Sequence, residues 1–306
     1  MLLRSAPIAL AVMLAAPPLP CVAQTPDRAR GDSRPQACPN CAEWNGPQRP
    51  FLLYGNPYYV GTHGLSAVPV TSSAGHVLID GALPESAPSI VAHIQALGFR
   101  IEDVKLILNS HPHYDHAGGI AALQRASGAR VAASPGSALV LARGASGSDD
   151  PRYGILATFP PVSEVTVLAD GEIVRVGSLA LTAHFTPRHT PGGTSWSWQE
   201  CEDGQCLDLV YADSQAPVSA DGFAFTRSRT YPPALTDFER GHAVLEQLPC
   251  DVLITPHPGA SQLWERRAAR DHGRPAALVA PEACRRYVTR AGEQLAERVA
   301  AEAAQP

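Results

Sequence analysis

The sequence has no block of like charge and, beyond its first residues, no apolar run approaching about 20 residues. Its 24 basic and 29 acidic residues leave a formal net charge of −5 in a chain of 306 residues. The lack of a basic patch or an acidic tail argues against nucleic acid as a partner. The lack of a long apolar run argues against a membrane-spanning segment. We therefore expect the partner to be a small molecule.

A shorter apolar run does open the chain. It follows a single basic residue and leads into a proline-rich stretch that ends in small residues at Ala23. This order is typical of a secretory signal peptide, which we predict at residues 1–23. Lipoprotein processing at Cys21 is disfavoured because Pro20 precedes it. The expected mature protein is therefore periplasmic and has no membrane anchor.

Six cysteines remain after the predicted signal peptide is removed. In an exported protein an even number of cysteines indicates disulfides, but six cysteines allow 15 connectivities and the sequence does not choose among them. A redox or zinc role for the "CPNC" at 38–41 is disfavoured, because neither a thioredoxin-like context nor two further ligands lie nearby. One arrangement uses the pairs that are nearest in the sequence: Cys38/Cys41, Cys201/Cys206 and Cys250/Cys284.

Regular structure is predicted from residue 51 onward, in a single domain over 51–306 that follows a loosely held arm at 24–50. Short β-branched runs come first, and helical and strand periods then alternate in two similar halves. This order favours an α/β fold in which two sheets are layered together with helices outside. The segment 144–163 is broken by Gly and Pro and is expected to be a long loop. After the first short runs, the expected strands are 104–110, 129–134, 172–176, 179–185, 194–199, 207–212 and 251–255, and the expected helices are near 85–98, 117–127, 136–144, 235–247 and 281–300.

Ligand-type side chains are concentrated in "HPHYDH", directly after the predicted strand at 104–110. His111 and His113 are two positions apart on an extended segment and can point the same way. Asp115 and His116 follow as the chain turns and can face a second centre. Four such residues in six positions at the end of a strand indicate a metal site.

A zinc site needs further ligands from elsewhere in the fold. Two histidines have the required setting at the end of a predicted strand. His189 lies in "TPRHTPGGT" between two strands, and His257 lies in "TPHPGA" after the buried strand at 251–255. A sheet-based site collects its residues at such positions.

These motifs resemble the metallo-β-lactamase superfamily. Within it, "GNPYYVGTHGLS", "SHPHYDHAGG", "HTPGGTSWSW", "YADS" and "LPCDVLITPHPGA" are similar to segments of the subclass B3 enzymes, and the resemblance covers about residues 40–290. It implies a four-layer αβ/βα sandwich of two mixed sheets with helices on the outer faces. It also implies two zinc ions in a groove at the edge of the sheets.

The resemblance also implies an activity and a set of metal ligands. The activity is hydrolysis of the β-lactam ring of penicillins, cephalosporins and carbapenems by a zinc-bound hydroxide that Asp115 orients, which gives antibiotic resistance. No Ser-x-x-Lys acylation motif is visible, and we expect a monomer. By motif, the first zinc is assigned to His111, His113 and His189, and the second to Asp115, His116 and His257.

The segment "YADS" at 211–214 distinguishes subclass B3 from other hydrolases of the superfamily. Other hydrolases of the superfamily place an aspartate here that bridges both metals, so a bridging Asp213 would indicate a lactone, thioester or phosphodiester substrate. In subclass B3 the serine position is not a ligand, and Ser214 is then expected to contact the substrate. Relatives commonly have a second serine or threonine two positions later, where this chain has Ala216.

Three aromatic residues, Trp44, Tyr153 and Phe159, are candidates for the rim of the groove, although packing beneath loops would explain them equally well. Asp149 and Asp150 lie in the same long loop as Tyr153 and are expected to be solvated. A zinc-binding protein without enzymatic activity is the least favoured alternative, because the predicted ligand set leaves coordination positions open.

Overall fold

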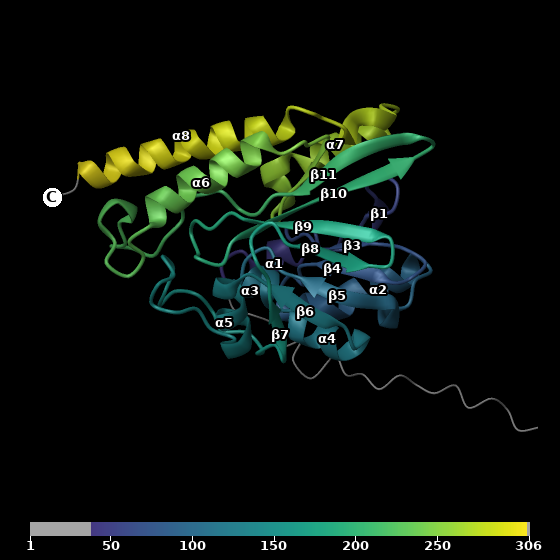
Figure 1. Cartoon of the computed structure of the whole chain (residues 1–306), viewed down its shortest axis with the longest axis horizontal. Coiled ribbons are helices and arrows are strands. Elements are labelled where there is room, and N and C mark those ends of the chain that lie inside the picture. Colours follow the sequence, from purple (N-terminus) through teal and green to yellow (C-terminus); the bar gives the residue numbers. More distant parts are fainter. Residues whose placement is uncertain (1–37, 305–306) are drawn as a thin grey trace, which may run out of the picture.

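The computed structural model describes residues 38–304, so the predicted signal peptide lies outside the described residues. Two five-stranded sheets lie face to face between two groups of helices (Figure 1). The prediction of a layered α/β sandwich with helices on its outer faces is confirmed. Within residues 38–304, no helix combines the length and the apolar character needed to cross a membrane.

The first sheet has the strand order β3-β4-β5-β6-β7. Its β3 and β4 are antiparallel, and the other neighbours are parallel. Strands β4 and β5 are almost continuously apolar and almost fully buried, as expected for strands covered on both faces. The strands of this sheet are β3 (Val68–Val70), β4 (His76–Ile79), β5 (Val104–Leu108), β6 (Arg130–Ala133) and β7 (Val165–Val167).

The second sheet has the order β12-β11-β10-β9-β8. It is antiparallel except for the pairing of β11 with β12. Its long central strands alternate between buried and exposed side chains, because one face packs on the first sheet. The strands are β8 (Ile173–Val176), β9 (Leu179–Phe185), β10 (Thr194–Glu202), β11 (Gln205–Tyr211) and β12 (Val252–Ile254). A separate two-stranded sheet joins β1 (Phe51–Leu52) to β2 (Tyr58–Tyr59).

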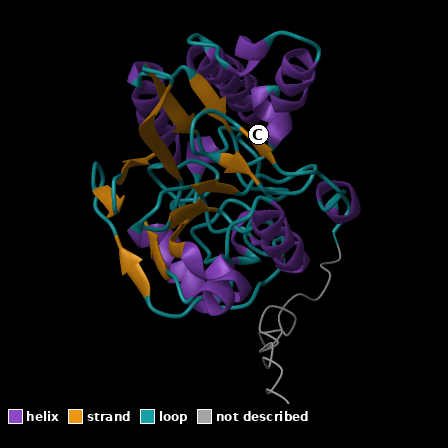
Figure 2. Ribbon diagram, turned by 90° about the vertical axis from the view of Figure 1, so that its right-hand side faces the viewer, coloured by secondary structure: helices purple, strands orange, loops and turns teal. Residues whose placement is uncertain are grey.

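The hydrophobic core has a central layer between the two sheets and an outer layer under each group of helices. The central layer includes Trp196, which is fully buried and donates its indole N–H to the Asn109 carbonyl at 3.2 Å. Figure 2 shows the strands between the helices at both sides. The helices over the first sheet are α2 (Ala87–Ala96), α4 (Ile120–Ser127) and α5 (Pro135–Arg143), and those over the second are α6 (Ala234–Gln247) and α8 (Ala283–Ala303).

The sequence did not predict strand β7, and two further expectations needed correction. Residues 38–50 are not a loose arm, since α1 (Cys41–Trp44) buries Cys41 in the core and is tied to the Thr62–Gly64 segment by hydrogen bonds. Helix α7 (Leu263–Asp271) was missed, because it is short and mostly charged and has Leu263 as its only buried residue.

Three disulfides join the cysteines of the described chain in the pairs nearest in sequence: Cys38–Cys41, Cys201–Cys206 and Cys250–Cys284. Cys201 and Cys206 are cross-strand partners next to the turn of the β10–β11 hairpin. Cys250 and Cys284 link the chain just before β12 to the start of α8.

Replacing both Cys250 and Cys284 with alanine is expected to lower the free energy of unfolding by about 3 to 4 kcal/mol. The disulfide closes a loop between residues 34 apart, and its loss increases the conformational entropy of the unfolded chain. Chemical denaturation of the metal-free protein measures the change. The Cys201/Cys206 double alanine variant is the control, because its shorter loop predicts a smaller loss; an equal loss from both variants would contradict the loop-length argument.

Candidate metal centre

The ends of four strands bring the predicted site residues together. His111 and His113 directly follow β5, and Asp115 and His116 lie in the helical turn α3 (Tyr114–Ala117) that comes next. His189 lies in the loop between β9 and β10, and His257 follows β12. All six residues therefore meet at one edge of the paired sheets, although they are separated by up to about 150 positions in the sequence.

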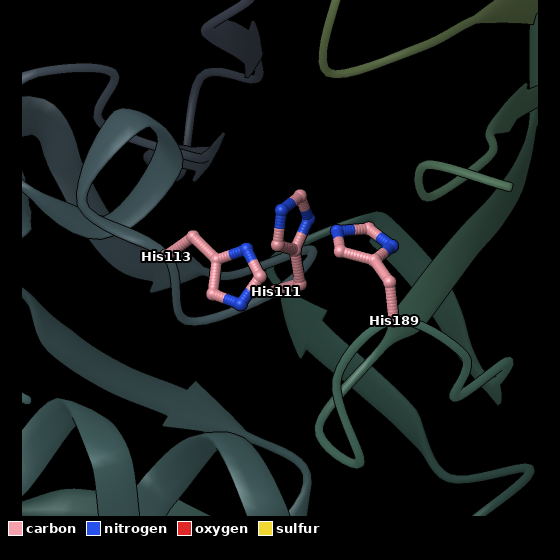
Figure 3. Close-up of side chains that lie close together, drawn as sticks. All are labelled: His111, His113 and His189. Carbon is pink, nitrogen blue, oxygen red and sulfur yellow. The ribbon is translucent and has the colours of Figure 1, made fainter. Parts of the chain in front are cut away.

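The first group consists of His111, His113 and His189. Their imidazoles come from two loops and point toward one another in Figure 3. One nitrogen from each ring lies within 4.8 Å of the others. All three residues are at most 3% exposed. Three converging imidazoles in a closed setting are a donor set that suits zinc or a similar divalent ion.

The second group gathers around Asp115. His111, Asp115 and His116 offer ligand atoms within 4.8 Å of one another. One carboxylate oxygen of Asp115 lies 3.2 Å from Nε2 of His116 and 3.4 Å from Nε2 of His257. The His257 side chain is 33% exposed, so this group is the one that opens toward solvent.

The electrostatics of the two groups favour a bound cation. Burial lowers the pKa of His116 to about 4 and lowers the pKa values of His111 and His189, so that these rings are neutral with lone pairs available at pH 7. Burial acts to raise the pKa of Asp115, but His116 and His257 outweigh it and hold this pKa well below its usual value.

Several buried donor and acceptor atoms in the two groups lack a hydrogen-bond partner within the described chain. Buried polar atoms without partners are costly, and cations bound at the two groups would satisfy several of them. The residues therefore fit a divalent metal. The atoms are His113 Nδ1, Asp115 Oδ1, His116 Nδ1 and His189 Nδ1.

Two carboxylates hold the histidines of the first group from behind. Asp213 Oδ1 lies 2.7 Å from His111 Nδ1, and Asp150 Oδ2 lies 2.8 Å from His113 Nε2. Asp150 is only 3% exposed, so the expectation that it is solvated was wrong. This contact could not be predicted from sequence patterns, because Asp150 lies in an irregular loop 37 residues from its partner.

Asp213 is placed as a support for the first group of histidines. Its second oxygen lies 3.5 Å from a guanidinium nitrogen of Arg188, a fully buried arginine that also donates to the Ser214 carbonyl. Neither group of converging ligand atoms in the described chain includes Asp213. The geometry therefore favours an outer role for Asp213 over the bridging alternative.

The predicted rim residues have different outcomes. Trp44 is half-buried and packs on His257 with ring centroids 5.1 Å apart, and Tyr153 is 57% exposed on the long loop. Phe159 is 6% exposed and belongs to the core beneath that loop. The expectation that Phe159 lines the groove is therefore corrected: it serves packing.

Asp80, which the sequence reading did not single out, anchors the end of β5. Its carboxylate accepts hydrogen bonds from the Ser110 amide at 2.7 Å, the Ser110 hydroxyl at 2.6 Å and the Tyr211 hydroxyl at 2.8 Å. Asn109 donates to it as well, at 3.1 Å. The segment that leads into His111 is thereby tied to both sheets.

The stability of the protein should depend on pH through Asp80. Burial raises the pKa of Asp80 from 3.8 to about 6, so the folded state holds a proton that the unfolded state has already lost. The contribution is therefore fully present below pH 3.8 and is lost as the pH rises through 6. The unfolding free energy of the wild type minus that of Asp80→Asn should be about 2 kcal/mol larger at pH 4 than at pH 7.5. Urea denaturation at both pH values measures this, and equal differences would contradict it.

Comparisons with known proteins agree with this geometry. The family model of the metallo-beta-lactamase superfamily matches residues 63–283. The structure of the Rm3 metallo-beta-lactamase is 58% identical, covers 87% of this chain and 99% of its own, and superimposes with a TM-score of 0.86. The structure of MEM-A1, a subclass B3 metallo-beta-lactamase from a soil metagenome library, is 50% identical, covers 86% of this chain and 100% of its own, and has a TM-score of 0.84.

The curated relatives match more narrowly. A hydroxyacylglutathione hydrolase from Anaeromyxobacter dehalogenans (strain 2CP-C) is 35% identical over 122 residues, which is 40% of this chain and 37% of that protein. A hydroxyacylglutathione hydrolase from Bradyrhizobium sp. (strain ORS 278) is 33% identical over 108 residues, 35% of this chain and 32% of its own length. The chain thus spans about a third of the length of the curated relatives it matches.

Proposed function

The chain belongs to the metallo-beta-lactamase superfamily, and we propose that it is a zinc-dependent β-lactamase of subclass B3. It is a hydrolase that opens the β-lactam ring of penicillins, cephalosporins and carbapenems and so gives antibiotic resistance. The observation that carries the proposal is the convergence of the six imidazole and carboxylate side chains at one sheet edge. This convergence accompanies 58% identity to a metallo-beta-lactamase over nearly all of its length.

The superfamily implies a divalent metal, and we propose two zinc ions per chain. The first would be held by His111, His113 and His189. When bound, zinc supplies a Lewis acid that lowers the pKa of a coordinated water to about 7. The second would be held by Asp115, His116 and His257.

The residues of the chain itself supply orientation and proton handling. Asp115 places one carboxylate oxygen between His116 and His257, and its other oxygen is buried without a partner in the described chain. That free Oδ1 is positioned to accept a hydrogen bond from the attacking water and to orient it toward the lactam carbonyl. The low pKa of Asp115 keeps it in the accepting form at neutral pH.

Substrate contacts are assigned to side chains around the opening. Ser214 is half-buried beside Asp213, and we assign its hydroxyl to the substrate carboxylate. Trp44, against His257, and the exposed Tyr153 provide apolar surface for the substrate. Ala216 lacks the hydroxyl that many relatives place there, so Ser214 carries this contact with less help.

We propose further that the protein is exported to the periplasm through cleavage of residues 1–23 and acts there as a monomeric single domain, which includes the α1 segment as well as residues 51–306. The three disulfides support export, because disulfides persist in oxidising compartments. Size-exclusion chromatography with light scattering of the secreted protein and sequencing of its N-terminus test these assignments.

The function is tested by a hydrolysis panel on one preparation of known metal content. A penicillin, a cephalosporin and a carbapenem should be hydrolysed, and exhaustive chelation should abolish the activity until zinc is added back. S-lactoylglutathione, a thioester of the kind that the name of the curated relatives points to, is the competing substrate. Turnover of the thioester without turnover of any β-lactam would replace the proposal with the thioester hydrolase alternative.

A further inference from the structure

Asp150 differs from its neighbours in the long loop that follows α5. The adjacent Asp149 is exposed, whereas Asp150 is 3% exposed and points toward the first group of histidines. One of its carboxylate oxygens accepts the Arg152 amide hydrogen at 2.8 Å, which fixes the carboxylate within the loop. The other oxygen lies 2.8 Å from His113 Nε2. Asp150 is thus held in place from one side and holds a histidine on the other.

This contact determines which nitrogen of His113 is available. A carboxylate accepts a hydrogen bond, so His113 Nε2 must carry the proton. In the neutral ring the lone pair then lies on Nδ1, the atom that is buried without a partner in the described chain. The same ring faces His111 and His189, with ring centroids 4.8 and 5.1 Å away.

The Asp150 carboxylate also reaches the loop of the third histidine. The side chain of Thr190, which follows His189 directly in the chain, lies near enough to help lower the pKa of Asp150, after the larger effect of His113. The backbone of the next residue in the long loop, Pro151, accepts a hydrogen bond from the Ala220 amide at 2.9 Å. The loop at 144–163 is therefore connected to His113, to the His189 loop and to the segment after Asp213.

We propose that Asp150 is a positioning residue that fixes the tautomer and ring orientation of His113 for a divalent metal ion at the first group of histidines. The long loop thereby forms part of the metal site rather than only its rim. The inference rests on the proposed function, since it assumes that His111, His113 and His189 hold a metal. A carboxylate behind a metal-binding histidine orients the ring and makes the imidazole a stronger donor.

The test compares Asp150→Ala with Asp150→Asn and with Asp149→Ala as the matched control. Zinc affinity is measured by competition with a chromophoric chelator, independently of turnover. In Asp150→Ala the dissociation constant of the first zinc should rise about 10- to 100-fold. Asp150→Asn should lose less, because its amide oxygen still accepts the Nε2 hydrogen. Asp149→Ala should bind zinc as the wild type does. With saturating zinc, kcat should recover in the alanine variant and KM should stay near the wild-type value.

The outcomes separate the inference from the function on which it rests. Unchanged zinc affinity in Asp150→Ala, with a wild type that binds zinc and hydrolyses β-lactams, would overturn the inference and leave the function standing. A wild type that binds no zinc would overturn both. A purely structural role would lower the melting temperature of the metal-free Asp150→Asn and Asp150→Ala variants equally while leaving zinc affinity intact, and this result would also refute the proposal.

Discussion

Replacing His189 with alanine is expected to lower kcat/KM for β-lactam hydrolysis by about 10³-fold, because one of three ligands of the first metal is removed. The three rings enclose one space, and no other histidine of the described chain belongs to this group. The lost imidazole is replaced at best by water, which binds zinc more weakly. Zinc content should fall from two ions per chain toward one.

The measurement combines steady-state hydrolysis of a carbapenem with a metal count on the same preparation. His184→Ala is the matched control, since His184 lies five residues earlier in β9 and hydrogen-bonds to the Ser197 hydroxyl at 2.8 Å, outside both groups. It should retain activity within about threefold and both metal ions. Full activity of His189→Ala would show that this ring is not a ligand and would remove the basis of the first site.

The strands that build the site could be predicted because their patterns are local. The segment "VKLILNS" is apolar in its first five residues except for Lys105, and these five residues form the largely buried strand β5. "DVLIT" behaves in the same way and forms β12. Both runs are followed by ligand-type residues. The prediction that His111 and His257 belong to one site therefore needed only the positions where the strands end, and no tertiary contact.

The carboxylate that holds His113 from behind could not be predicted from the sequence. Asp150 is one of two adjacent aspartates in a loop without periodicity, and only the folded path of residues 144–163 buries the second and leaves the first exposed. Phe159 was misplaced for the same reason. Whether an aromatic residue in an irregular segment faces the core or the solvent depends on the backbone path, and no repeat in the sequence encodes that path.

Asp115→Asn is expected to lower kcat by about 10³-fold, the order of effect seen when an oriented acid–base group is removed. Asparagine keeps the shape of the side chain but replaces one carboxylate oxygen with an amide nitrogen and removes the charge. Asp115 Oδ2 accounts for the contacts with His116 and His257 at 3.2 and 3.4 Å, so the free Oδ1 is the atom left to orient water. The single amide oxygen of asparagine can either contact His116 and His257 or accept a hydrogen bond from water, but it cannot do both.

The expected signature is a fall in kcat with a weaker second zinc site and an unchanged first one. A titration with Co²⁺, followed by its absorption spectrum, separates the two sites, because the first has three nitrogen donors and the second includes an oxygen donor. Asp149→Asn makes the same chemical change on the exposed surface of the long loop and should behave as the wild type does. If Asp115→Asn kept kcat within threefold at saturating zinc, water would be oriented by some other group. In that case the buried Oδ1 of Asp115 would serve metal binding alone.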